Sequence, residues 1–145
     1  MLKLVGALIA FVVVGSGVGT VFAGQDAAEV PAATLAEAAK MPNPVKPTEE
    51  SIAKAKKLYS VDCAMCHGED GSGKGEVAVG GGYTVKDYRK AETLKDRKDG
   101  ELFYIIHNGQ GKMPAEGDRA KTDVTWNLVI YLRSFSDPSV LPGKK

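Results

Sequence analysis

The pentapeptide Cys63-Ala64-Met65-Cys66-His67 constrains this chain of 145 residues more than any other feature. Two thiols three residues apart lie on one side of a helical turn, where they can add to the two vinyl groups of a haem. The histidine that follows is then placed to coordinate the iron. The chain contains two cysteines and two histidines, so chance gives this pattern roughly one time in five thousand. We therefore expect one covalent haem c, attached through Cys63 and Cys66, with His67 as an iron ligand.

Two other uses of paired cysteines are the alternatives. A local disulfide or a thioredoxin-like redox pair is typical of a βαβ unit, and no strand pattern precedes the motif. A zinc site needs further soft ligands, and His107 at its distance from the cysteines matches no common zinc spacing. Haem attachment explains the pattern better than either alternative.

Haem iron has a sixth coordination position, for which the chain offers few donors. Met113 lies on a loop that Pro114 stiffens, and its thioether is soft enough to bind iron. Met65 is inside the attachment turn, on the wrong side of the ring. His107 is better explained as the C-terminal residue of a helix than as an iron ligand. Its replacement of Met113 under some condition stays an open alternative. The expected axial pair is His67 and Met113, a combination that raises the reduction potential.

Three segments have the apolar spacing of amphipathic helices, and no longer stretch alternates as a half-buried strand does. The first segment follows Pro47, with Thr48 as its N-cap. The second runs from about Asp99 to His107, and the third from about Thr122 to Phe135. The expected fold class is all-α, with three to four short helices and long glycine-rich loops.

The first 47 residues predict two segments outside the folded domain. Residues 1–23 combine Lys3 with a long uncharged run, which is typical of a signal peptide and also fits an N-terminal membrane anchor. Either reading places the rest of the chain in the periplasm or on the extracytoplasmic face of the membrane. Residues 24–47, rich in Ala and Pro, predict an extended linker with at most a transient helix over Ala32–Lys40. The folded domain is then 48–137, and 138–145 is a C-terminal tail.

The stretch from Gly68 to Glu101 is short of apolar residues, with eight among 34. A domain of this size buries a modest share of its surface even with an ordinary composition. A central haem wrapped by the loops accounts for the shortage, and we then expect a largely unfolded apoprotein. The side chains expected to face the haem are those of Leu102, Phe103, Ile106, Met113, Leu128 and Leu132.

From about residue 48 to 136 the chain resembles class I mono-haem c-type cytochromes of the bacterial type. The stretches that carry the resemblance, in order, are Lys57-Leu58-Tyr59, Cys63–His67 followed by Gly68-Glu69-Asp70-Gly71-Ser72-Gly73, Asp99-Gly100-Glu101-Leu102-Phe103, Met113-Pro114, and Trp126 to Arg133. The resemblance implies a cytochrome c fold around covalent haem. It also implies that the first and last helices of the domain cross, with Ala55 and Tyr59 against Leu128, Tyr131 and Leu132.

One departure from the family concerns the ligand histidine. Many relatives carry a proline after the motif, whose carbonyl orients this histidine, and here no proline lies between Pro47 and Pro114. A ligating imidazole still needs a partner for its second nitrogen, so we expect a backbone carbonyl from residues 73–82 to orient His67. Four side chains are candidates for the haem propionates or for ordinary packing: Tyr83, Tyr88, Arg89 and Trp126.

The function implied by the resemblance is that of a one-electron carrier, not an enzyme. Its partners would be redox proteins that donate and accept electrons, and the carrier would be a monomer. Nineteen basic and eighteen acidic residues leave a net charge of +1, which argues against nucleic-acid binding and predicts docking that depends weakly on salt. Two alternatives stay open: a membrane-tethered haem subunit of a larger respiratory oxidoreductase, and a haem sensor or peroxidase with a labile sixth ligand.

Overall fold

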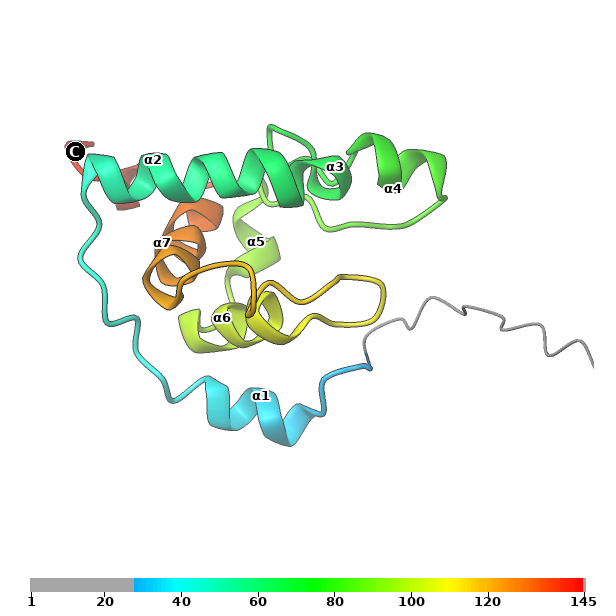
Figure 1. Cartoon of the computed structure of the whole chain (residues 1–145), viewed down its shortest axis with the longest axis horizontal. Coiled ribbons are helices and arrows are strands. Elements are labelled where there is room, and N and C mark those ends of the chain that lie inside the picture. The colour runs from blue at the N-terminus through cyan, green and yellow to red at the C-terminus, as the bar shows by residue number, and fades with distance from the viewer. Residues whose placement is uncertain (1–27, 145) are drawn as a thin grey trace, which may run out of the picture.

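A computed structural model describes residues 28–144 as an assembly of short helices (Figure 1). The helices are α1 (Ala32–Ala38), α2 (Glu49–Leu58), α3 (Ala64–His67), α4 (Glu76–Gly80), α5 (Ala91–Leu94), α6 (Asp99–Asn108) and α7 (Thr122–Arg133). A π-helical turn, Tyr59–Cys63, joins α2 to α3, and a 3-10 turn, Pro138–Val140, follows α7. No β-strand occurs in residues 28–144, and the predicted all-α class is confirmed.

Helix α2 begins at its predicted N-cap. Thr48 Oγ1 accepts a hydrogen bond from the N–H of Ser51 at 3.1 Å, and Ser51 Oγ accepts one from the N–H of Thr48 at 2.9 Å. This reciprocal capping box satisfies two backbone donors at the helix start. The Ser51 hydroxyl also lies 2.7 Å from Asn127 Oδ1 and donates to it. The cap therefore ties α2 to α7 as well as starting the helix.

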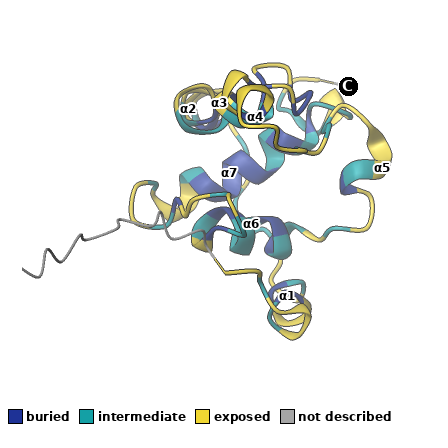
Figure 2. Cartoon of the chain, turned by 90° about the vertical axis from the view of Figure 1, so that its right-hand side faces the viewer, coloured by how far each residue is buried: buried dark blue, intermediate teal, exposed yellow. Residues whose placement is uncertain are grey.

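Helices α2 and α7 cross at the centre of the core, and Figure 2 shows α7 as the most buried of the helices. Ala55 and Val129 have no exposed surface at the crossing. Tyr59 is also fully buried, and its ring lies 5.4 Å from that of Tyr131 and 5.2 Å from that of Phe135. Aromatic pairs of this kind contribute about 0.5–1.5 kcal/mol beyond their buried area. The crossing that the family resemblance implies is present.

The segment expected to be an extended linker contains a packed helix over residues 32–38. Helix α1 buries Leu35 and Ala38, and it lies below α6 in Figure 1. The close approach depends on Gly100 in the first turn of α6, because a Cβ atom there would lie 1.9 Å from the Ala38 carbonyl oxygen. The structure differs from the expectation because the helix is stabilised by this distant contact and not by its own apolar pattern.

The connection from α3 to α6 contains α4 and α5, which the apolar periodicity did not predict. Each helix buries one apolar residue, Ala78 in α4 and Leu94 in α5, so neither has a repeating pattern to detect. Helix α4 starts directly against the motif, because a Cβ atom on Gly75 would lie 2.4 Å from the Met65 carbonyl oxygen. The segment after the motif is thus packed against it, although most of its side chains are exposed (Figure 2).

The expected signal peptide or anchor, residues 1–23, lies outside the described residues. Within residues 28–144, no helix combines the length and the apolar content needed to cross a membrane. The expected C-terminal tail begins with the turn Pro138–Val140, where Asp137 Oδ1 accepts a hydrogen bond from the N–H of Ser139 at 3.0 Å.

Candidate haem site

Three of the four predicted site residues line one apolar cavity. Cys63 lies at the end of the π-helical turn, His67 at the end of α3, and Met113 in the loop between α6 and α7. The fourth, Cys66, is half-buried and does not line the cavity. Seven further residues complete the lining: Tyr59, Tyr88, Leu102, Ile105, Ile106, Leu128 and Leu132.

Backbone hydrogen bonds hold the loop after the motif against the attachment turn. The carbonyl of His67 accepts from the N–H of Gly73 at 2.7 Å, and that of Cys66 accepts from the N–H of Gly75 at 3.1 Å. Gly73 has a φ of +72°, and a Cβ atom on it would lie 2.4 Å from the Val85 carbonyl oxygen. Glycine is therefore required where the loop folds back, and the fold-back fixes the direction of the motif turn.

The His67 imidazole is partly buried, and its environment differs from the expected one. Burial lowers the pKa of His67 below its usual value, which favours the neutral imidazole that binds metals. Its Nδ1 atom is buried and has no hydrogen-bond partner, so the expected carbonyl from residues 73–82 does not orient it. The ring instead stacks on Tyr88, with centroids 5.1 Å apart and planes 15° from parallel.

The two cysteines are free and both half-buried. Burial raises the pKa of the Cys63 thiol to about 12, with a further contribution from the carboxylates of Glu116 and Asp62. Reactive redox cysteines have the opposite property, a lowered pKa that supplies thiolate at neutral pH. This environment argues against the thioredoxin-like alternative.

Met113 is held in a tight turn. Its N–H donates to the Gln110 carbonyl at 2.9 Å, and its carbonyl accepts from the Gln110 N–H at 3.0 Å. Gly109 has a φ of +76°, and a Cβ atom on it would lie 2.6 Å from the Met113 carbonyl oxygen. The Met113 side chain packs against the buried core, whereas that of Met65 is 52% exposed. Of these two thioethers, only that of Met113 reaches the cavity.

Phe103 was expected to face the haem, but it does not line the cavity. It stacks on Trp126 with ring centroids 4.1 Å apart and on His107 with centroids 5.6 Å apart. Ile105 takes its place, because residues 102, 105 and 106 share one face of α6. His107 is likewise absent from the lining, so the structure does not bring it to the site as a second ligand.

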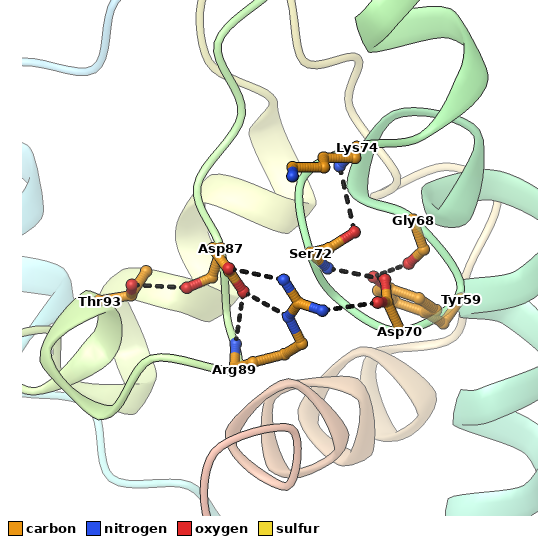
Figure 3. Close-up of polar contacts among 8 residues, drawn as sticks. All are labelled: Tyr59, Gly68, Asp70, Ser72, Lys74, Asp87, Arg89 and Thr93. Atoms are coloured by element: carbon orange, nitrogen blue, oxygen red, sulfur yellow. Dashed lines mark hydrogen bonds and ion pairs between the residues drawn. The ribbon is translucent and has the colours of Figure 1, made fainter.

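The four propionate candidates are separated by the structure. Tyr88 lines the cavity, Tyr83 is exposed, and Trp126 is buried against Phe103. The Arg89 guanidinium is already bonded to two carboxylates. Its Nη1 donates to Asp70 Oδ2 at 2.8 Å, and its Nε donates to Asp87 Oδ1 at 2.9 Å (Figure 3). The Arg89 hydrogen bond lowers the pKa of Asp87 to about 2. The sequence gives no pattern for this cluster, because its members come from two separate loop segments.

The donor set and its surroundings fit a haem. The free thiol of Cys63, the His67 imidazole with its buried, unpaired nitrogen and the Met113 side chain occur at the wall of a cavity whose other lining is aliphatic or aromatic, and the second free thiol, that of Cys66, lies three residues along the same turn. An apolar cavity with so few polar groups suits a flat aromatic cofactor better than a hydrated ion.

Comparisons with known proteins agree with this chemistry. The profile of the family described as cytochrome C oxidase, cbb3-type, subunit III matches residues 50–132. A thiosulfate dehydrogenase of Stutzerimonas stutzeri (strain A1501) is 29% identical over 103 residues, which are 63% of this chain and 31% of that protein. The chain therefore spans about a third of the length of this relative.

Two solved structures are similar in fold. A chain of the Kuenenia stuttgartiensis reducing HAO-like protein complex Kustc0457/Kustc0458 has a TM-score of 0.54 and 25% identity, over 67% of this chain and 48% of that one. The KustC0563 c-type cytochrome has a TM-score of 0.51 and 25% identity, over 57% of this chain and 98% of that one. The expected cytochrome c fold is confirmed.

Proposed function

The chain belongs to the family of cytochrome c oxidase, cbb3-type, subunit III, and from this premise we propose that it carries single electrons on one covalent haem c. In this proposal Cys63 and Cys66 would attach the haem, and His67 and Met113 would bind its iron. The observation that carries the proposal is that Cys63, His67 and Met113, from three separate segments, line the same apolar cavity.

The protein residues would set the properties of the carrier. The haem supplies reversible one-electron chemistry at its iron. The apolar side chains of α6 and α7, among them Leu102 and Leu128, exclude water from the cavity and lower the local dielectric. With His67 and Met113 both bound to the iron, no position would remain there for a substrate, which suits a carrier rather than a catalyst.

Electrons would enter and leave at the attachment turn. Met65 is 52% exposed between the two cysteines, and Val61, one turn earlier, is 61% exposed, so the turn that carries the thioethers lies at the surface. The near-neutral charge of the chain predicts docking with redox partners that depends weakly on ionic strength. We place this carrier on the extracytoplasmic side of a membrane, as the expected export segment and the chemistry of haem attachment suggest.

A second candidate is a haem unit that works within a larger oxidoreductase. The observation in its favour is length, since the matched regions are 31% of the thiosulfate dehydrogenase and 48% of the chain from the HAO-like complex. Size-exclusion chromatography of a gentle extract, followed by haem absorbance, separates the two. A free carrier elutes at the size of one chain, and a fixed subunit elutes with a larger assembly.

Carbon monoxide binding tests the axial ligation and the sensor or peroxidase alternative. The oxidised wild-type protein should show a sulfur–iron charge-transfer band, and its reduced form should not bind carbon monoxide at neutral pH. Met113→Ala should lose the band and bind carbon monoxide rapidly. Met65→Ala is the matched control and should behave as the wild type, because this side chain points to solvent. Rapid binding by the wild type would contradict stable ligation by Met113.

A further inference from the structure

We propose that Tyr88 fixes the orientation of the His67 imidazole by ring stacking, in place of a hydrogen bond to Nδ1. The inference rests on the proposed role of His67 as an iron ligand. The two rings are 15° from parallel with centroids 5.1 Å apart, and both residues line the cavity. A ligating histidine ordinarily has its second ring nitrogen held by a hydrogen bond. In this structure that nitrogen is buried and unpaired, which leaves the stack as the contact that restrains the ring.

Tyr88 is itself held on both sides. Its N–H donates to the Gly71 carbonyl at 2.8 Å, so its backbone is joined to the loop that follows the motif. The next residue, Arg89, bridges Asp70 of that loop and Asp87, at 2.8 and 2.9 Å (Figure 3). The stacking ring therefore projects from a segment that is anchored immediately before and after it.

The loop that receives these bonds is also fixed. The Tyr59 hydroxyl, on a fully buried side chain, donates to the Gly68 carbonyl at 2.7 Å. Gly71 has a φ of +72°, and a Cβ atom on it would lie 2.8 Å from the Phe135 ring. At Gly71 the loop thus packs against Phe135, just after α7, with no room for a side chain. A chain of contacts then runs from the helical core through Gly68–Gly71 to Tyr88 and on to His67.

Stacking can do this work because the torsion between Cβ and the imidazole ring is otherwise broad. A flat neighbour whose ring centroid lies 5.1 Å away disfavours orientations in which the two planes are crossed. The direction of an axial imidazole plane sets the splitting of the iron d orbitals in the low-spin ferric state. The ring orientation is therefore readable by electron paramagnetic resonance without any assay of electron transfer.

The test compares three variants of the haem-loaded protein in the oxidised state. Tyr88→Phe keeps the stack and should retain the wild-type spectrum. Tyr88→Leu removes it and should give displaced and broadened g-values, because several ring orientations become populated. Tyr83→Leu makes the same change at an exposed position in the same connection and should leave the spectrum unchanged. An unaltered spectrum for Tyr88→Leu overturns the proposal, and so does an altered spectrum for Tyr88→Phe, which would assign the role to the hydroxyl.

Arg89→Gln decides the matter if Tyr88→Leu does not assemble with haem. This substitution is at an exposed residue and keeps the Tyr88 side chain, but it removes the bridge that anchors the segment from which the ring projects. The looser stack should broaden the g-values. A wild-type spectrum for Arg89→Gln would then overturn the proposal. Failure of the proposed function looks different, because in that case the wild-type protein itself lacks the low-spin signal of a histidine-ligated haem.

Discussion

Arg119 forms an ion pair with Glu116, a residue that is only 3% exposed. The second carboxylate oxygen of Glu116 is buried and has no partner. Arg119 also lies 3.7 Å from Asp62, the residue before Cys63. The guanidinium of Arg119 thus joins Glu116, in the same loop as Met113, to the turn that carries the first attachment cysteine.

Removal of Arg119 should be costly, because it leaves a buried carboxylate without a counter-charge. We expect Arg119→Gln to lower the free energy of unfolding in a denaturant titration, and by clearly more than the loss of an exposed ion pair. The double variant Arg119→Gln with Glu116→Gln should recover most of this loss, since no buried charge is then left unpaired. Lys54→Gln breaks the exposed pair with Glu50 and serves as the control, with an expected change close to zero. If Arg119→Gln and Lys54→Gln lower the free energy of unfolding equally, the proposed role of Arg119 is wrong.

The contact between α1 and α6 should be broken by a single methyl group. A Cβ atom on Gly100 would lie 1.9 Å from the Ala38 carbonyl, so Gly100→Ala should displace α1 and cost about 1–3 kcal/mol. Amide hydrogen exchange should rise across residues 32–38, and the thermal midpoint should fall. Gly80→Ala is the control, because the added carbon would meet no atom within 4 Å beyond its chain neighbours and its own helix backbone. This substitution should be neutral or slightly stabilising. Unchanged exchange in α1 of Gly100→Ala would contradict the close packing of α1 on Gly100.

The pH dependence of stability should report the bond between Arg89 and Asp87. The pKa of Asp87 is lowered from 3.8 to about 2, so the bond stabilises the folded protein fully above pH 3.8. This stabilisation is lost as the pH falls through about 2. The difference in unfolding free energy between the wild type and Asp87→Asn should therefore be constant near neutral pH and shrink toward zero in acid. In an Arg89→Gln background the same substitution should show a much weaker pH dependence, because only the backbone N–H of residue 89 and the charge of Lys90 then lower the pKa of Asp87. An undiminished pH dependence would contradict the assignment to the Arg89 side chain.

The apoprotein should be largely unfolded, because the cavity is lined by residues that also form the core. Four residues both line the cavity and belong to the hydrophobic core: Leu102, Ile106, Leu128 and Leu132. Without haem they surround a space that apolar contacts do not fill. Far-UV circular dichroism of Cys63→Ala, Cys66→Ala should show a large loss of helical signal relative to the loaded wild type. Native-like helicity in this variant would mean that the polypeptide alone is a sufficient core.

The helices with a strong period were predictable from the sequence. The expected segments 99–107 and 122–135 correspond to Asp99–Asn108 and Thr122–Arg133, and Thr48 caps α2 as predicted. Helix α1 was not predictable as a packed element, since its burial depends on the absence of a side chain at Gly100. The face of α6 that meets the cavity was predicted with one error, Phe103. Periodicity placed this residue at the edge of the apolar face, and only the position of Trp126 decides where its ring stacks.

The attachment motif and Met113 could be proposed from residue type and spacing, because haem chemistry requires those donors in that order. The restraint on the His67 ring could not be predicted from the sequence. It depends on the stack with Tyr88 and on the Arg89 bridge, which join parts of a loop with no repeating pattern. The burial of Glu116 could not be predicted either, because a charged residue in a loop is ordinarily exposed.

The central claim is that part of the core is a covalently bound haem. The intact mass of the wild-type protein, measured under denaturing conditions after expression in a host that attaches haem to c-type cytochromes, tests it most directly. We expect the mass of the polypeptide plus one haem, and the mass of the polypeptide alone for Cys63→Ala, Cys66→Ala. A wild-type mass without haem would contradict the assignment of Cys63, Cys66, His67 and Met113 to a haem site.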